Sequence, residues 1–176
     1  MTPQELAAKT GEVIGVSDWF DVTQERINKF AEATGDFQFI HLDAQKAKLT
    51  PFGGTIAHGF LTLSLLPVLG AMTEGAKIDG VKMGVNYGGN KTRFISPVKS
   101  GKRVRSHTKL IELIEKRPGQ WQQTNEVTIE IEGEDKPALI TEWITSFSCD
   151  VVPGLTRDRW PPRADLEHTD PGSSPG

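Results

Sequence analysis

The fold is decided by one apolar stretch, which reads HGFLTLSLLPVLGAM from His58 to Met72. Apolar residues occur on nearly every side of a helix drawn over these positions, so we expect the helix to be buried on most sides. Pro67 lies inside it and should introduce a kink. The stretch is too short and too rich in polar residues to cross a bilayer. The sequence therefore predicts a buried central helix.

Four runs rich in β-branched residues follow this helix, at 81–98, 103–115, 121–132 and 138–151. Turn-forming residues separate the last three runs as hairpins. One helix followed by such a meander predicts an α+β domain in which an antiparallel sheet wraps around the helix. We place this single domain at residues 1–152, followed by a flexible Pro/Gly-rich C-terminal tail at 153–176.

Two capped helices are predicted upstream of the central one. Thr2 has the character of a cap for the first, and β-branched and aromatic residues at 13–20 indicate an early strand. Thr23 caps the second helix, which Gly35 should end. From 36 to 54 the pattern loses its periodicity, so we expect a loop with one short turn in it.

The composition is that of a globular protein. The chain has 176 residues, of which 36% are hydrophobic and 24% charged, and its formal net charge is -3. Nucleic-acid binding needs a basic face, so we expect no nucleic-acid partner. The single cysteine, Cys149, excludes an intrachain disulfide and a thiolate-rich metal site, and it suits a reducing compartment. The first residues do not resemble a secretory signal, so we expect a cytoplasmic protein with no membrane partner.

A second stretch, ATGDFQFIHLD at 33–43, contains the chemistry-bearing residues. Asp36 and His41 lie five residues apart, just past a helix end. A loop held by Gly35 and by neighbouring apolar residues would place both side chains in one partly buried pocket. A carboxylate and an imidazole together can hold one water and divide proton transfer between them, which reversible hydration requires.

His58 and Gly59 lie where the buried helix begins. Free backbone N–H groups and the positive end of the helix dipole gather at such a point. Glycine allows a substrate carbonyl to approach the backbone closely. The N–H of Gly59 is therefore a candidate oxyanion donor for a polarised thioester.

Each of these residues also has a plainer interpretation. Asp36 would belong to a turn, and His41 would be a hydrogen-bonded packing residue. His58 would cap the helix or pair with a backbone carbonyl, which is the interpretation we prefer for it, and Gly59 would serve close packing. A metal site of His41, Asp43 and His58 matches no compact ligand spacing, so we expect no metal.

The segment TGDFQFIHLD at 34–43 resembles the hydratase motif of the MaoC-like, (R)-specific enoyl-CoA hydratases. AHGFLT at 57–62 resembles the start of the central helix of their hot-dog fold, and residues 86–98 resemble the first long strand after it. The similarity extends over nearly all of the expected domain. The first motif is specific when the second follows it at this distance.

The resemblance implies a hot-dog fold in which Asp36 and His41 form the catalytic pair and Gly59 supplies the oxyanion N–H. It implies syn addition of water to a trans-2-enoyl thioester of coenzyme A, or of acyl carrier protein, to give the (R)-3-hydroxyacyl product. It also implies a homodimer with the active site near its interface, and no cofactor. The candidate substrate-binding residues are Gln38, Phe39, His58, Thr62, Asn86 and Arg93.

Two departures from the family pattern bear on these roles. The usual motif has Asn-Pro where this chain has Gln38-Phe39, a form that resembles the branch including nodulation protein N. Some members support the catalytic pair with a helix serine. That place falls on Pro67 here, which leaves Thr62 or Ser64 for the role, although both hydroxyls also suit a bond to the carbonyl four residues back.

Two other functions compete with hydration. A hot-dog thioesterase would place its acid on or near the central helix, which has no Asp or Glu before Glu74. A non-catalytic acyl-thioester binding subunit is the second rival, and an intact set of Asp36, His41 and Gly59 speaks against it. Arg93 either meets the coenzyme A phosphates or is a solvated strand charge.

Overall fold

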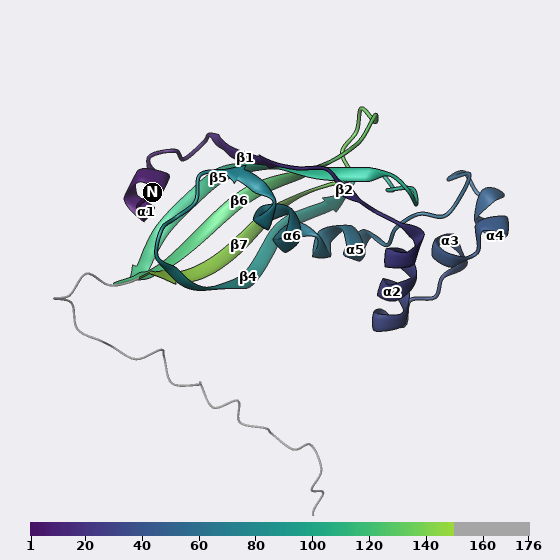
Figure 1. Cartoon of the computed structure of the whole chain (residues 1–176), viewed down its shortest axis with the longest axis horizontal. Coiled ribbons are helices and arrows are strands. Elements are labelled where there is room, and N and C mark those ends of the chain that lie inside the picture. Colours follow the sequence, from purple (N-terminus) through teal and green to yellow (C-terminus); the bar gives the residue numbers. More distant parts are fainter. Residues whose placement is uncertain (150–176) are drawn as a thin grey trace, which may run out of the picture.

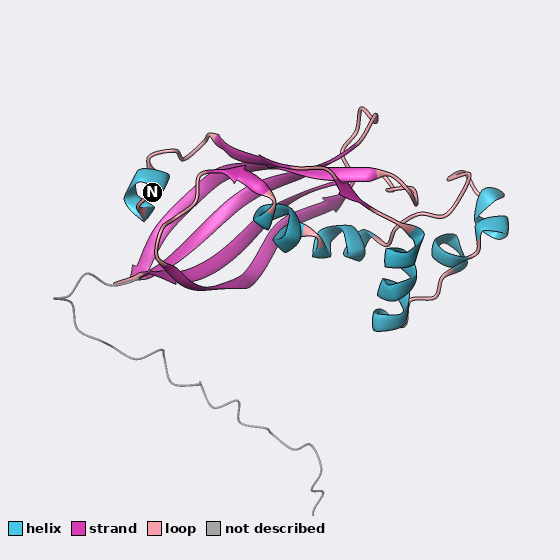
Figure 2. Ribbon diagram, viewed as in Figure 1, coloured by secondary structure: helices cyan, strands magenta, loops and turns pink. Residues whose placement is uncertain are grey.

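The computed structural model describes residues 1–149, so the tail predicted at 153–176 lies outside the described part of the chain. An antiparallel sheet curves around two short helices, α5 and α6, which run along its inner face (Figure 1). Three further helices, α2, α3 and α4, lie beyond one end of the sheet, and α1 lies at the other (Figure 2). The α+β fold with an antiparallel sheet around a central helix is confirmed.

The N-terminal elements follow the predicted caps. Helix α1 (Pro3–Ala7) begins with a reciprocal capping box between Thr2 and Glu5. Strands β1 (Val13–Ser17) and β2 (Phe20–Asp21) divide the early strand into two pieces. Helix α2 (Gln24–Thr34) starts where Thr23 accepts a hydrogen bond from a first-turn N–H and stops at Gly35, whose φ of 76° is left-handed.

The segment predicted as a loop after α2 contains more helix than expected. Helix α3 (Phe39–Leu42) is a single turn, and helix α4 (Ala44–Lys48) occupies the place of the predicted short turn. The Asp43 carboxylate accepts hydrogen bonds from two backbone N–H groups at the start of α4. A helix of one turn leaves little periodicity to read in a sequence, which is why α3 was not predicted, whereas α4 lies where a short turn was expected.

The central helix is broken rather than kinked. Helix α5 (Gly59–Ser64) ends before Leu65, and helix α6 (Leu66–Ala71) begins after it. Pro67 lacks an N–H and its ring crowds the preceding turn, so the helix ends one turn before the proline. The expectation of burial on most sides is confirmed, since only one stripe of the two helices is exposed, at Phe60, Ser64, Pro67 and Ala71. On this stripe Phe60 is 67% exposed, because no described segment covers it.

The four predicted strands are confirmed as β4 (Val81–Phe94), β5 (Arg103–Arg117), β6 (Gln120–Ile131) and β7 (Leu139–Cys149). Together with β3 (Thr73–Gly75), the strands pair in the order β3-β1-β5-β6-β7-β4, and β2 also pairs with β5. Every pairing is antiparallel. Strand β4 therefore forms one outer edge of the sheet.

The main core lies between the inner face of the sheet and the buried side of α5 and α6. It is built from aliphatic side chains, and its most deeply buried members are Val22, Ile27, Leu69, Val104, Ile129 and Leu139. Burial of such side chains supplies the main favourable free energy of folding. A smaller cluster around Leu6 and Leu110 fixes α1 to the far end of the sheet.

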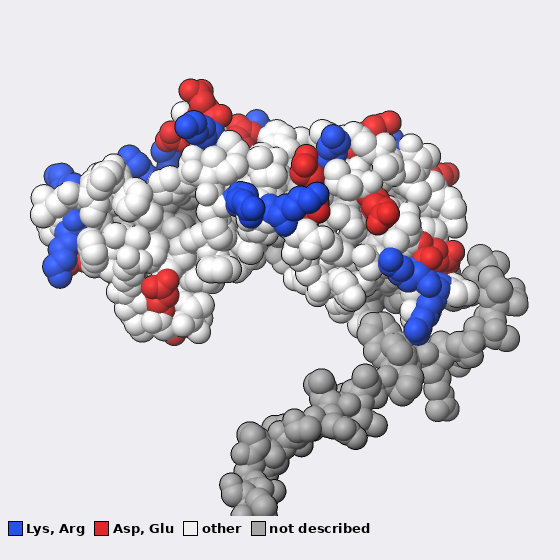
Figure 3. Space-filling view, turned by 180° about the vertical axis from the view of Figure 1, so that it is seen from behind, with Lys and Arg blue, Asp and Glu red and all other residues white. Residues whose placement is uncertain are grey.

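The outer surface carries both signs of charge. On the face seen in Figure 3, Lys and Arg side chains are interspersed with Asp and Glu among a largely uncharged surface. This mixture agrees with the small net charge of -3. Among the described residues, no helix is both long and apolar enough to cross a membrane.

Candidate active site

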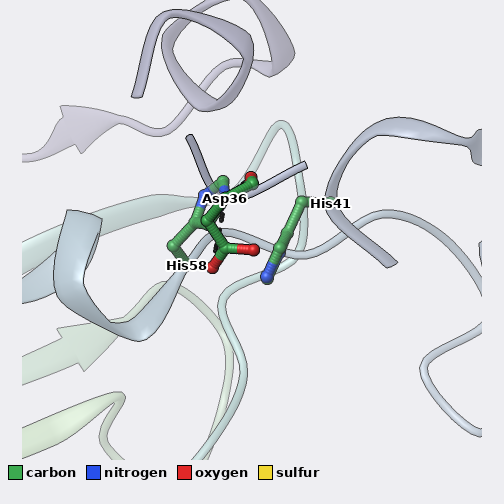
Figure 4. Close-up of side chains that lie close together, drawn as sticks. All are labelled: Asp36, His41 and His58. Atoms are coloured by element: carbon green, nitrogen blue, oxygen red, sulfur yellow. Dashed lines mark hydrogen bonds and ion pairs between the residues drawn. The ribbon is translucent and has the colours of Figure 1, made fainter. Parts of the chain in front are cut away.

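Three polar side chains from separate segments meet at the junction of α2, α3 and α5. Asp36 follows the glycine that ends α2, His41 lies on α3, and His58 directly precedes α5. Figure 4 shows the Asp36 carboxylate lying beside both imidazoles. His41 and His58 are buried, whereas the Asp36 side chain is 54% exposed. The site is therefore open to solvent on the carboxylate side.

A backbone carbonyl determines which nitrogen of His41 carries the proton. The Nδ1 atom lies 2.7 Å from the carbonyl oxygen of Ile56. A carbonyl can only accept, so Nδ1 is the donor and Nε2 of the neutral ring carries a lone pair. Burial lowers the pKa of His41, and the nearby His58 lowers it further, against the opposing effects of the Ile56 carbonyl and of Asp36. The ring is thus held neutral at pH 7 with a basic nitrogen available.

His58 is oriented by the same kind of contact. Its Nε2 donates to the backbone carbonyl of Asp36 over 3.0 Å, which confirms the preferred sequence interpretation of this histidine. Its ring stacks on that of His41, with centroids 3.7 Å apart. Its Nδ1 is buried and has no hydrogen-bond partner among the described residues. His58 therefore links the Asp36 backbone to the His41 ring.

A cavity of about 240 Å³ opens beside these groups, and His41, Gly59 and Thr62 contribute to its wall. Gly59 is the first residue of α5, where a backbone N–H has no partner within the helix. A Cβ at Gly59 would lie only 3.0 to 3.2 Å from the ring of Phe94. The close packing considered for this glycine therefore occurs, and it occurs at the cavity wall.

Gln24, at the start of α2, was not predicted from the sequence. It holds in place the two segments that position His41. Its amide nitrogen donates to the backbone carbonyl of His41 over 2.7 Å, and its amide oxygen accepts from the Thr55 hydroxyl over 2.6 Å. Thr55 immediately precedes Ile56, the residue that orients the His41 ring. One side chain on α2 thus connects both segments that position His41.

The remaining candidates near the site lie on α5 and around the start of α3, and they differ in their contacts. The Thr62 hydroxyl bonds to the carbonyl of His58 at 3.4 Å, and Ser64 makes the same four-residue bond on the exposed side of α5. The backbone N–H of Gln38 donates to the Asp36 carboxylate, as in an Asx turn, which confirms the turn considered for Asp36. The adjacent Phe39 is 43% exposed at the start of α3.

Two candidates on β4 lie apart from this cavity. Asn86 contributes to a different cavity, of about 570 Å³, between α6 and the sheet. The Arg93 guanidinium donates to the neighbouring backbone carbonyl of Thr92 and is exposed. Neither side chain therefore belongs to the group formed by Asp36, His41 and His58.

The same group also has the composition of a metal site. One ligand atom from each of Asp36, His41 and His58 falls within 4.8 Å of the others. Two imidazoles and a carboxylate suit zinc and related cations. Asp43, the carboxylate considered from the sequence, instead caps α4 and pairs with Lys46. The cluster can therefore hold either a water molecule or a cation.

Comparison with known proteins identifies the family of this chain. The sequence matches the family model described as MaoC like domain over residues 5–134. The chain belongs to the MaoC-like dehydratase family. This MaoC-like chain is a hydro-lyase that acts on 3-hydroxyacyl thioesters.

Two curated relatives cover most of this MaoC-like chain. The 3-hydroxyacyl-thioester dehydratase Z of Mycobacterium tuberculosis is 48% identical over 143 residues, which make up 81% of this chain and 93% of that protein. Nodulation protein N of Rhizobium leguminosarum bv. viciae is 46% identical over 147 residues, which make up 83% of this chain and 91% of that protein. The resemblance to the nodulation protein N branch is confirmed.

A solved structure supports the fold. The (R)-hydratase from A. caviae involved in PHA biosynthesis superposes with a TM-score of 0.62 and 26% identity, covering 76% of this chain and 95% of that one. The hot-dog architecture expected from the two motifs is thereby confirmed for this MaoC-like protein.

Proposed function

We propose that this protein catalyses the reversible addition of water to a trans-2-enoyl-CoA, giving the (R)-3-hydroxyacyl-CoA. The observation that supports this proposal most strongly is the neutral His41 ring, whose basic Nε2 lies beside the Asp36 carboxylate at the wall of a cavity that also includes Gly59. A base, a second proton-handling group and a backbone donor are the groups that hydration of an enoyl thioester needs.

In the hydration direction, the N–H of Gly59 donates to the thioester carbonyl and draws negative charge onto its oxygen. Water is held between the Asp36 carboxylate and Nε2 of His41. As the water oxygen bonds to C3, its proton passes to this pair, and the pair returns a proton to C2. One water O–H bond and one C=C π bond are broken, and one C–O and one C–H bond are formed. Dehydration is the reverse sequence.

The homodimer is also a proposal, and exposed apolar surface supports it. Phe60 on the uncovered side of α5 is 67% exposed, and the outer strand β4 exposes Met83, Val85 and Tyr87. An unpaired strand edge with apolar side chains is a surface that a second copy of the chain can cover. Light scattering after gel filtration distinguishes the proposed dimer from a monomer.

The experiment that tests the reaction follows the loss of enoyl-thioester absorbance from crotonyl-CoA, with chiral analysis of the product. Asp36→Asn and His41→Gln should each lower kcat by about 10²–10⁴-fold, the usual contribution of one general acid or base. Matched controls are Asp43→Asn, which keeps the α4 cap, and His107→Gln on β5, where His107 pairs with Glu130.

Three outcomes would contradict the proposal. The first is full activity in either site variant while both controls also remain active. The second is release of free coenzyme A without hydration, which would favour the thioesterase. The third is binding of enoyl-CoA without turnover, which would favour a non-catalytic subunit. Comparing crotonyl-CoA with the crotonyl thioester of acyl carrier protein tests the proposed thiol.

A further inference from the structure

A groove of about 510 Å³ crosses four strands of the sheet at the end where α1 lies (Figure 2). Strand β4 contributes Met83, Val85 and Tyr87 to its wall, and β5 contributes Lys116 and Arg117. The three apolar side chains from β4 are all exposed. A contiguous exposed apolar patch on a soluble protein commonly marks a surface that binds something.

The groove lies on the outer face of the sheet, away from α5 and α6. On β7, Phe147 packs into the smaller core cluster on the inner face. Side chains alternate along a strand, so its neighbours Ser146 and Ser148 point outward. Val85 pairs with Ser146 in register. Met83 pairs with Ser148, so both apolar side chains of β4 face outward as well.

The groove ends before a bulge in β4, and its last β4 residue is Tyr87. Further along, three steps from Asn90 to Arg93 correspond to two steps along β7, and Lys91 has a φ of 50° there. Because side chains alternate between faces, the extra residue turns Phe94 to the inner side, where it lines the cavity of the candidate active site. The groove and that cavity therefore lie on different faces of the sheet.

The described chain ends beside this groove. Strand β7 ends at Cys149, the residue that follows Ser148 of the groove wall. The Cys149 backbone N–H donates to the carbonyl of Gly119 over 3.0 Å. Residues 150–176 follow directly. A segment attached by a short flexible linker has an effective concentration on the order of 1 mM at a neighbouring surface, so even a weak contact is populated.

The first part of this segment has a composition that suits the groove. It reads VVPGLTRDRWPP at 151–162. Pro153–Gly154 is a pair typical of turns, and a turn there directs the following residues back along the sheet. At about 3.3 Å per residue, Leu155–Trp160 covers about 20 Å when extended, whereas Met83–Tyr87 spans about 13 Å. The segment is therefore long enough to cover the apolar part of the groove, and it has an apolar residue at each end.

We propose that residues 155–160 dock in the groove of their own chain and cover the apolar side chains that β4 exposes there. This inference does not depend on the proposed function. It places on the sheet a stretch that belongs to the tail predicted as flexible. Docking on the face of β4 leaves the backbone edge of that strand free, so it is compatible with a second copy that pairs along the edge.

Limited proteolysis of the full-length protein tests the docking, with cleavage in the tail measured by mass spectrometry. Trypsin cleaves after Arg159, inside the docked segment, and after Arg163, beyond it. A synthetic peptide of residues 150–176 gives the rate at each bond without a groove. Since proteolysis follows the population of the open form, cleavage after Arg159 should be about 10-fold or more slower than in the peptide, and after Arg163 less than about 2-fold slower.

Two variants locate the contact. Met83→Ala shortens an apolar side chain of the groove, and Leu155→Ala shortens one of the tail. Each should bring cleavage after Arg159 close to the rate in the peptide of matching sequence. Ile111→Ala, exposed on β5 and outside the groove wall, is the matched control and should keep the protection. Met83 is 56% exposed, so its variant should remain folded, which the melting temperature verifies.

Three results overturn the proposal. Cleavage after Arg159 at the rate of the free peptide shows that the segment is not docked. Protection that persists in Met83→Ala shows that the segment binds elsewhere. Protection that disappears on dilution shows that the groove holds the tail of a second copy, because docking within one chain is independent of protein concentration.

Discussion

The imidazole rings of His41 and His58 lie stacked, with 3.7 Å between their centroids and 26° between their planes. Each ring donates one hydrogen bond to a backbone carbonyl, His41 to Ile56 and His58 to Asp36. Both rings are buried, so a positive charge on His41 would be poorly solvated. The stack therefore favours the neutral form of His41 that the proposed mechanism uses.

Replacing His58 by phenylalanine tests this stack. In His58→Phe a ring remains against His41, but the electrostatic effect that lowers the His41 pKa is removed, so that pKa should rise. The acid limb of the pH profile of kcat/KM should then move to higher pH. Loss of the hydrogen bond to the Asp36 backbone should also lower kcat. An acid limb at its original pH, together with an unchanged kcat, would contradict the role given to His58.

The pKa of His41 also predicts how stability depends on pH. Burial lowers it from an ordinary value of 6.5 in the unfolded chain. As the pH falls below that ordinary value, the unfolded state takes up a proton before the folded state does, so the free energy of unfolding should decrease until the lowered folded pKa is passed. Urea unfolding at several pH values should show this slope, and His41→Gln should reduce it. An equal slope in both proteins would refute the prediction.

Gln24 is predicted to act as a positioning residue. Gln24→Ala leaves the part-buried His41 carbonyl and Thr55 hydroxyl without this partner, a loss of about 0.5–1.5 kcal/mol per hydrogen bond. Since the proton-transfer geometry depends on both segments, kcat should fall by about 10-fold with little change in KM. Gln45→Ala, on the exposed side of α4, is the control. A fall in melting temperature with full kcat would show that Gln24 is only structural.

Gly59 and Phe94 should behave as a coupled pair. In Gly59→Ala the added methyl meets the Phe94 ring at 3.0 to 3.2 Å, so the ring must shift at the cavity wall and kcat/KM for crotonyl-CoA should fall. Combining it with Phe94→Ala removes the clash and should restore part of the loss. Two losses that simply multiply would show that the residues act independently, because coupling appears as non-additivity in a double-mutant cycle.

Local signals were enough to predict much of the fold. Thr2 and Thr23 occupy the N-cap positions that their hydroxyls favour, and Gly35 occupies a C-cap with the positive φ that glycine allows. The four long strands follow in the predicted order. The break at Leu65 and the bulge at Lys91 were not predicted. Both depend on how a segment fits its neighbours in three dimensions, since leucine favours helix and lysine rarely adopts a positive φ.

Of the candidate site, the sequence predicted the residues that lie in the two motifs. His41 and Gly59 do line one cavity, and the Asp36 carboxylate lies beside His41. Gln24 was missed because a glutamine in the first turn of a helix is usually a surface residue. Phe94 received no role because its direction depends on the bulge that precedes it, which has no sequence signature of its own.

The bulge in β4 has a consequence for how this protein can change. Because the inward direction of Phe94 depends on the number of residues between Asn90 and Arg93, deleting one codon there would turn Phe94 and the strand residues next to it to the opposite face of the sheet. The aromatic ring that packs against Gly59 at the cavity wall would then be lost in a single genetic step. The spacing of β4 thus controls the shape of the cavity wall independently of the Asp36, His41 and Gly59 codons.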